Sequence, residues 1–252
     1  MDSKKKADKK AAMEKFFEED FALDFVRFSG ETSRIVATCI LSACEDFGTT
    51  KKKEENAIES IRKMCGVLIH NTELNAVLAD HCGGNEPELY CVPVAAHIDE
   101  VVKGCKKVLK RKCAVKAEKI DKSLCIDASF RTLNFMLVGA VRALKMGGAK
   151  EITYSCTAKP KSVTISVSAD SFDPREVKDA LMSGVGMIER FYPEIFEVLA
   201  EKLGGKFAAK KNALCFTLPR CEYDEKRVYV SPQQVAQHVM YAPYNMILRD
   251  IV

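Results

Sequence analysis

Among the side chains in this sequence that could accept a phosphoryl group, His70 is the strongest candidate. It lies within GVLIHNTELNAVL, a segment whose pattern predicts a helix. A solvent-facing imidazole at this position could accept a phosphoryl group from an aspartyl phosphate. The alternative is an ordinary surface or seam histidine without chemistry. His81, near the end of the same helix, would in its protonated form interact favourably with the helix dipole.

Other catalytic chemistries have little support. The eleven cysteines are odd in number and dispersed, and no two of them form a CxxC pair, so we expect free thiols in a reducing cytoplasm. The spacing of His81, Cys82 and Cys91 is too loose to predict a zinc site, and we expect no metal. There is no GxSxG motif for a serine nucleophile.

Composition predicts a soluble globular protein, with 252 residues, 47% hydrophobic residues and a formal net charge of +4. Residues 101–122 carry nine Lys or Arg against two acids. Glu118 and Asp121 interrupt this run and it contains no aromatic residue. A solvated face is therefore a better interpretation than a surface for nucleic acid or membrane.

The start, MDSKKKADKK, is not followed by an apolar segment typical of a signal peptide.

Residues 1–82 are predicted to form an antiparallel helical hairpin, because the first proline is Pro87. The helices should span about Ala7–Phe47, with a bend at Ser29–Gly30, and about Glu54–Asp80. The second carries two apolar stripes, at Ile58, Ile61, Cys65, Leu68, Thr72 and Asn75 and at Met64, Val67, Asn71, Leu74 and Leu78. One hairpin cannot cover both stripes, so we expect a four-helix bundle in a homodimer.

Residues 88–219 predict an α+β fold, an α/β sandwich with helices over one face of a mixed sheet. The expected elements are helices at 95–111, 129–146, 174–182 and 193–203, strands at 115–120 and 124–127, a β-hairpin at 150–170 and a final hairpin that turns at Lys211–Asn212. Residues 220–252 form a C-terminal extension that is too apolar to stay free, and we expect it to dock.

Three segments carry a resemblance to a known family: DASFRTLNFMLVGAVRAL, AKEITYSC…SVTISVSAD and IFEVLAEKLGGKFAAKKNALCFTLP. With the hairpin, they resemble the core of a two-component histidine kinase over roughly residues 20–219. The resemblance implies a dimerisation hairpin followed by a Bergerat-type ATPase-like domain that binds ATP and Mg²⁺.

The residues that the family uses to bind Mg²⁺ are missing at the corresponding positions. The resemblance places Gly139 where the metal-ligating asparagine belongs. Phe135 takes the position of an earlier asparagine, and Asn134 is one residue out of register. Glycine has no oxygen ligand to offer, and Mg²⁺ needs oxygen ligands.

The adenine and lid positions also depart from the family. Asp170 corresponds to the aspartate that accepts from the adenine amino group, but Phe172 and Pro174 replace the glycines that should follow it. We therefore expect Asp170 or Asp173 to serve as a turn or helix-capping aspartate, with adenine binding by Asp170 as the alternative. Gly184 and Gly186 form a lone GxG, which is weak evidence for a phosphate-binding lid.

The first hairpin helix lacks the family's phosphoacceptor, since VRFSGETSRIV at 26–36 contains Glu31 but no histidine. We therefore predict a pseudokinase that acts through protein–protein contact, with a response regulator or another kinase as its partner and no cofactor. The alternative is a divergent, active ATP-dependent histidine kinase, or a histidine phosphotransferase that uses His70.

Overall fold

A computed structural model describes residues 22–45, 47, 50–81, 88–172, 192–228, 243–248 and 251. The chain divides into two compact units, Met1–Met64 and Cys65–Val252. The division falls inside helix α3 (Lys51–Ala79), whose C-terminal part belongs to the second unit. No helix in the described ranges is long and apolar enough to cross a membrane.

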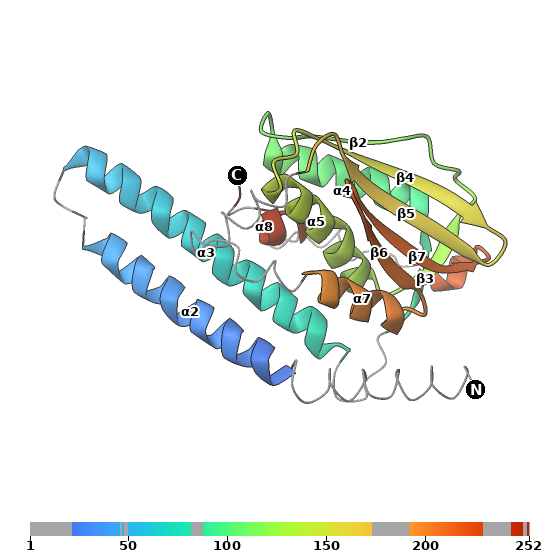
Figure 1. Ribbon diagram of the computed structural model, residues 1–252, viewed down its shortest axis with the longest axis horizontal. Coiled ribbons are helices and arrows are strands. Elements are labelled where there is room, and N and C mark those ends of the chain that lie inside the picture. Colours follow the sequence, from blue (N-terminus) through green and yellow to red (C-terminus); the bar gives the residue numbers. More distant parts are fainter. Residues whose placement is uncertain are drawn as a thin grey trace. The chain divides into compact units, whose positions relative to one another are not determined.

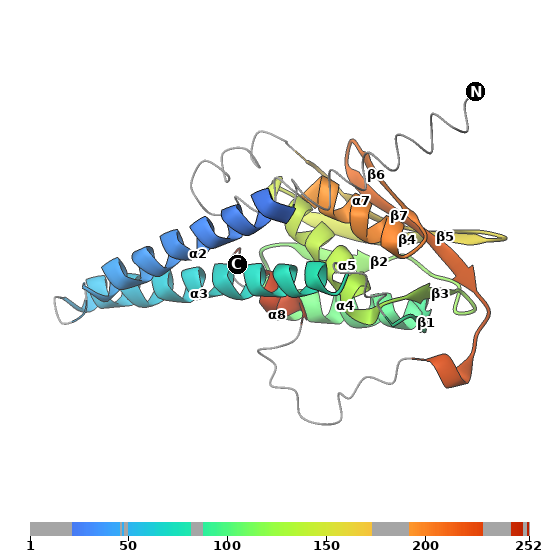
Figure 2. The same ribbon diagram turned by 90° about the horizontal axis from the view of Figure 1, so that it is seen from below.

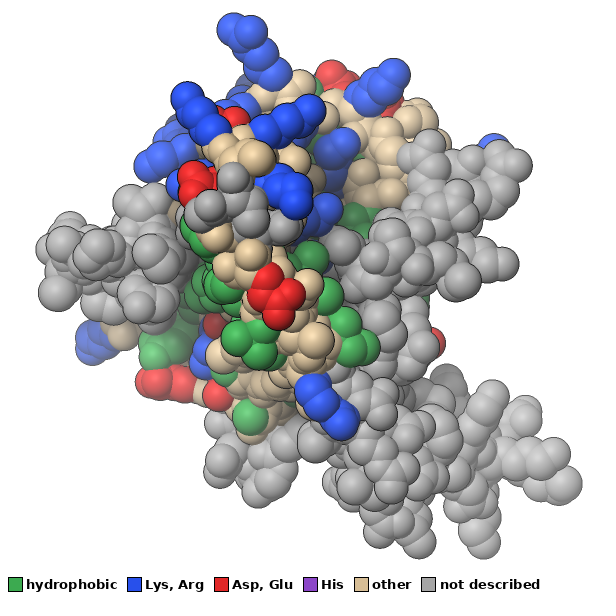
Figure 3. All heavy atoms as spheres, turned by 90° about the vertical axis from the view of Figure 1, so that its left-hand side faces the viewer, with side chains coloured by type: hydrophobic (Ala, Val, Ile, Leu, Met, Phe, Trp, Pro, Cys, Tyr) green, Lys and Arg blue, Asp and Glu red, His purple; other side chains and the backbone are tan. Residues whose placement is uncertain are grey.

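The first unit holds helix α2 (Ala22–Cys44) and the beginning of α3, which run antiparallel (Figures 1 and 2). Helix α2 continues through Ser29–Gly30, so the expected bend does not interrupt it. Four large apolar side chains of this unit are exposed, at Ile35, Leu41, Phe47 and Ile58. Figure 3 shows hydrophobic side chains reaching the surface between charged ones. The hairpin therefore carries exposed apolar side chains on both of its helices and in the connection between them.

The second unit is built on a seven-stranded mixed sheet with the order β1-β3-β7-β5-β4-β2, in which β6 also pairs with β7. Its strands are β1 (Tyr90–Pro93), β2 (Ala114–Ala117), β3 (Cys125–Ala128), β4 (Glu151–Lys159), β5 (Ser162–Ala169), β6 (Lys206–Lys210) and β7 (Ala213–Cys221). Among the strand pairs of the described residues, β2 and β4 run parallel and the others run antiparallel. The helices are α4 (Val94–Leu109), α5 (Phe130–Met146), α7 (Tyr192–Lys202) and α8 (Pro243–Leu248), with a short 3₁₀ turn η3 (Glu225–Arg227).

The core lies between one face of this sheet and helices α4, α5 and α7 (Figure 1). On β5, Val163, Ile165 and Val167 are buried and alternate with less buried serines and a threonine, as the period of a half-buried strand requires. Tyr154 of β4 is fully buried, and its hydroxyl donates to the backbone oxygen of Leu137 in α5 at 2.9 Å. This hydrogen bond joins the sheet to α5.

The predicted elements agree with this fold except at a few places. The hairpin turn at Lys211–Asn212 is confirmed, while the strand expected at 115–120 is shorter and ends at Ala117. Strand β1 was not predicted: it follows a glycine-rich break and pairs with β3. The helix expected at 174–182 lies outside the described residues.

Candidate functional site

Gly139, which the resemblance places at the position of the metal ligand, lies in the middle of α5 where α7 packs closely against it. A Cβ placed on Gly139 would be 3.2 Å from Cζ of Phe196 and 3.6 Å from Cε2 of Tyr192. Contacts near 3.2 Å are tight enough that the ring would have to move. The glycine thus lets the aromatic side chains of α7 approach the backbone of α5.

An aromatic cluster continues from this contact to the sheet. Phe135, which the resemblance places at an earlier asparagine position, is 1% exposed, and its ring centroid lies 6.0 Å from that of Tyr192. Phe196 lies 5.0 Å from Tyr192 and packs edge-on against Phe216 of β7 at 5.3 Å. These separations are typical of favourable aromatic pairs. The space between α5, α7 and the sheet is therefore filled by rings.

His70 belongs to this cluster and does not face solvent. Its side chain is 0% exposed, and its Nε2 lies 2.7 Å from the Tyr192 hydroxyl. Its ring stacks over Phe135 with a centroid distance of 6.4 Å and an interplanar angle of 6°. A phosphoacceptor histidine must be accessible to an incoming phosphoryl group. Because His70 is buried, the solvent exposure that this role requires is absent.

Two more polar groups, Glu73 of α3 and His81 in the turn after it, contact the N-terminal turn of α5. Arg131 donates from Nε and Nη2 to the two carboxylate oxygens of Glu73, both at 2.9 Å. Hydrogen bonding to Glu73 raises the pKa of Arg131 above its ordinary value. This bidentate geometry is the strongest arrangement for an arginine and a carboxylate.

His81 is also held by α5, through a 2.7 Å contact between its Nε2 and the Thr132 hydroxyl. Burial lowers the pKa of His81 below its ordinary value, which favours the neutral imidazole. The lowered pKa disfavours the protonated form that a favourable interaction with the helix dipole would need. His81 instead contributes a neutral, buried hydrogen bond between α3 and α5.

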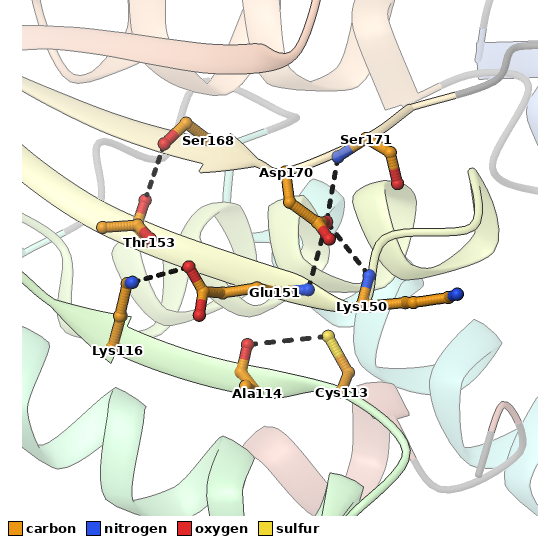
Figure 4. Close-up of polar contacts among 9 residues, drawn as sticks. All are labelled: Cys113, Ala114, Lys116, Lys150, Glu151, Thr153, Ser168, Asp170 and Ser171. Carbon is orange, nitrogen blue, oxygen red and sulfur yellow. Dashed lines mark hydrogen bonds and ion pairs between the residues drawn. The ribbon is translucent and has the colours of Figure 1, made fainter.

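Asp170 closes a turn at the end of β5 (Figure 4). Its Oδ1 accepts from the backbone N–H groups of Lys150 and Glu151, each at 3.1 Å, and of Ser171 at 2.9 Å. These bonds, that from Glu151 foremost, lower the pKa of the exposed Asp170 carboxyl. The structure gives Asp170 the turn role, in which it ties the end of β5 to the start of β4.

The residues around this turn close the other end of α5. A Cβ on Gly147, directly after α5, would overlap the ring of Phe172, so this phenylalanine, which the resemblance places at a family glycine, packs onto the helix end. Asn134 is buried within α5, 6% exposed. Asp173, Pro174, Gly184 and Gly186 lie outside the described residues. Within the described ranges, no group of three or more His, Cys, Asp or Glu side chains could hold a metal ion.

Sequence reasoning missed Tyr192, Glu73 and Arg131. A signal for Glu73 was present, because it lies three residues after His70, on the same face of α3, and eight residues before His81, about two helical turns further on. Nothing local marked Tyr192, whose role depends on a partner 122 residues away.

Comparison with solved structures finds this fold among histidine kinases. Histidine kinase ThkA in complex with response regulator protein TrrA matches with a TM-score of 0.54 and 15% identity, over 86% of this chain and 66% of that chain. Acinetobacter baumannii histidine kinase AdeS matches with a TM-score of 0.50 and 11% identity, over 76% of this chain and 97% of that one. Full-length ShkA in complex with AMPPNP matches with a TM-score of 0.49 and 14% identity, over 82% of this chain but only 46% of that one.

No protein-family model and no curated protein matches the sequence. At these identities the structural matches support the fold alone, and any function of the site has to be argued from its own residues. The chain therefore has the fold of a histidine kinase core.

Proposed function

We propose that this protein is a signalling protein with a histidine kinase-like core that acts by contact with other proteins and neither binds Mg²⁺–ATP nor autophosphorylates. One observation carries the proposal: the position of the metal ligand is a glycine, Gly139, closed over by Phe196 and Tyr192. In a nucleotide-binding protein this position would need an oxygen ligand and room for a metal ion.

The other residues that the resemblance assigns to nucleotide binding do not fit ATP and Mg²⁺ either. Phe135 has no polar atom, and it is buried among the aromatic rings. Asp170 uses Oδ1 for three backbone N–H groups, and Phe172 packs against Gly147 where glycine would leave space. We therefore propose no reaction step that uses a nucleotide at these residues.

Phosphoryl transfer through His70 has no support in the geometry. The imidazole is fully buried and lies within hydrogen-bond distance of Tyr192. Exposing it would require α3 to leave α5 and α7, which would also break the Arg131–Glu73 pair. A role for His70 in packing and hydrogen bonding accounts for these contacts.

The partners follow from the hairpin and from the fold. The exposed Ile35, Leu41, Phe47 and Ile58 offer an apolar surface that a second copy would cover in a four-helix bundle. ThkA, which shares the fold, was solved with a response regulator, so a response regulator is the second partner that we propose. The ten cysteines within the described ranges are all free, which supports a reducing compartment such as the cytoplasm.

Thermal unfolding with and without millimolar Mg²⁺–ATP tests the proposal. A ligand at about 100 times its dissociation constant adds about 2.7 kcal/mol to the free energy of unfolding. We expect no change in the unfolding midpoint. A clear rise, followed by incorporation of labelled phosphate from ATP, would replace this proposal with a divergent active kinase. Sedimentation of the purified chain tests the dimer separately.

A further inference from the structure

Positively charged side chains gather at one end of the sandwich, where α4 and α5 both end. The group, which we call the basic end, consists of Lys106, Lys107, Lys110, Arg111, Lys112, Lys145 and Lys150. Lys145 is half-buried and the others are exposed. The rest of α4 is covered by the sheet, by α5 and by α8 of the C-terminal extension. The lysines of α4 lie on the face that these elements leave exposed.

The fold brings together charges from two separate segments of the chain. Strands β2 and β4 run parallel, so the chain leaves α4 and α5 and enters these strands at the same edge of the sheet. There the backbone N–H of Ala114 donates to the backbone oxygen of Lys150 at 2.8 Å, and Figure 4 shows Lys150 beside the start of β2. Burial raises the pKa of the Cys113 thiol and the nearby charge of Lys145 lowers it, which places Lys145 at the same turn. The ends of α4 and α5 are therefore neighbours in space.

Pairing within the chain does not neutralise this group. In the parts of the chain that the structure describes, no ion pair joins the basic end to an acid. The two acids beside this turn have other partners (Figure 4): Glu151 pairs with Lys116, and Asp170 accepts from backbone N–H groups. The basic end thus keeps an excess of positive charge at the surface.

The dipoles of the two helices explain only part of the group. Cations in the last turn of a helix interact favourably with its dipole, which accounts for Lys106, Lys107 and Lys145. Lys110 lies beyond α4 with a backbone φ of 50°, and it is the single non-glycine residue with a positive φ in the described ranges. A side chain makes this conformation strained, and glycine would relieve the strain. The chain therefore keeps a charge where stability favours glycine.

Exposed acids limit the basic end on two sides. Asp99 and Glu100 lie on α4 about two helical turns, roughly 10 Å, before the first lysines of the group. Glu118 and Asp121 follow β2, whose four residues span roughly 13 Å. A DNA duplex or a bilayer is larger than this interval and would also bring its negative charges against these acids. Among the described residues, no large apolar side chain is exposed in this interval to enter a bilayer.

We propose that the basic end is a docking surface for a compact acidic patch on a partner protein. Complementary charges of this kind set the specificity and the rate of association more than the affinity. All but one of the cations are lysines, which act as separate point charges and suit a dispersed set of carboxylates. The inference does not depend on the function proposed above, because an acidic partner could bind here whether or not the chain binds Mg²⁺–ATP.

The test uses the full chain and two fluorescent peptides of identical composition. In the block peptide a run of glutamates stands between ends that carry lysines, and in the mixed peptide the glutamates and lysines alternate. Because the net charge is the same, the pair separates charge pattern from general attraction. Fluorescence anisotropy at low salt should show the block peptide bound about tenfold or more tightly than the mixed peptide, and its binding should weaken as salt is added.

A matched pair of triple variants locates the contact. The first variant carries Lys106→Gln, Lys107→Gln and Lys110→Gln. The control carries Lys159→Gln, Lys161→Gln and Lys211→Gln, three exposed lysines in other turns of the sandwich. Both remove the same charge from the chain. The first should weaken binding of the block peptide about tenfold, and the control should change it less than about twofold.

A single substitution, Lys110→Gly, separates binding from stability. Glycine relieves the strained backbone at this position, so the variant should unfold at a higher temperature than the wild type. It should at the same time bind the block peptide more weakly, because a charge is lost. A lysine that served only the fold would not give these opposite changes.

Four results would overturn the proposal. The block and mixed peptides could bind equally, or the control variant could lose as much binding as the first, and either would indicate general attraction. A DNA duplex or vesicles of anionic lipid could bind more tightly than the block peptide through the same lysines, which would assign the surface to another class of partner. Absence of binding at low salt would leave the basic end a solvated surface.

Discussion

Replacing Gly139 with asparagine would introduce the metal ligand that the resemblance expects at this position and at the same time test whether the position can hold it. We expect Gly139→Asn to destabilise the fold and to leave Mg²⁺–ATP binding absent. Gly139→Ala is the matched control, because it adds the Cβ without the amide. The comparison separates the cost of the extra carbon from that of a buried polar group.

The magnitudes follow from the distances at Gly139. Alanine gains about 1 kcal/mol of helix propensity over glycine. Its Cβ would lie 3.2 and 3.3 Å from two carbons of the Phe196 ring, and relief of this contact costs a similar amount. Gly139→Ala should therefore change the free energy of unfolding by less than about 1 kcal/mol. Asparagine adds further crowding of about 1–3 kcal/mol and an amide without partners at about 1–3 kcal/mol.

Thermal and urea unfolding of the three proteins measure these differences. A loss of about 3 kcal/mol lowers the melting temperature by about 6–12 °C for a unit of 150–250 residues. The reasoning fails if Gly139→Asn unfolds like the wild type. It also fails if that variant gains a midpoint shift with Mg²⁺–ATP, because the pocket would then exist and lack only its ligand.

Three further predictions concern the contacts around α3 and α4. Tyr192→Phe should lower the free energy of unfolding by about 1–3 kcal/mol, measured in urea, because His70 loses a buried hydrogen-bond partner. A double-mutant cycle with Arg131→Ala and Glu73→Gln should give a coupling near 1 kcal/mol, since the Arg131 side chain is 44% exposed; additive effects would contradict the pairing. Burial lowers the pKa of His97 to about 4 from 6.5, so the unfolded state binds the proton first as the pH falls. Stability should drop by up to roughly 3 kcal/mol between pH 6.5 and 4, and His97→Leu should flatten this dependence in urea titrations at several pH values.

Local patterns were sufficient to predict most of the second unit. The alternation in β4 and β5 and the turn at Lys211–Asn212 all depend on neighbours in sequence. The turn role of Asp170 also depends on residues near it in sequence, because its three hydrogen-bond donors lie within 20 residues. Strand β1 was missed because its four residues follow glycines and include a proline, which hide a short strand.

The contacts made by α3 could not be predicted from periodicity alone. Of the two apolar stripes, the one with Val67, Asn71 and Leu74 is buried, whereas Ile58 of the other is 39% exposed. Both stripes have helical spacing, and only the surface of α5 and α7 decides between them. Likewise, a glycine at position 139 signals a missing ligand, but only the rings of α7 show that the space is filled.

The contacts of α3 also say which motions of this helix the sandwich would sense. His70 and Glu73 lie on one face of α3, His81 lies in the turn directly after it, and the three bond to α7 and to the first turn of α5. Successive residues of a helix are about 100° apart, so a rotation by one residue position would carry all three groups away from their partners together. Breaking them one at a time would leave buried polar groups unsatisfied at about 1–3 kcal/mol each. The three contacts should therefore form or break together, so that α5 and α7 would experience a rotation of this part of α3 as a single change.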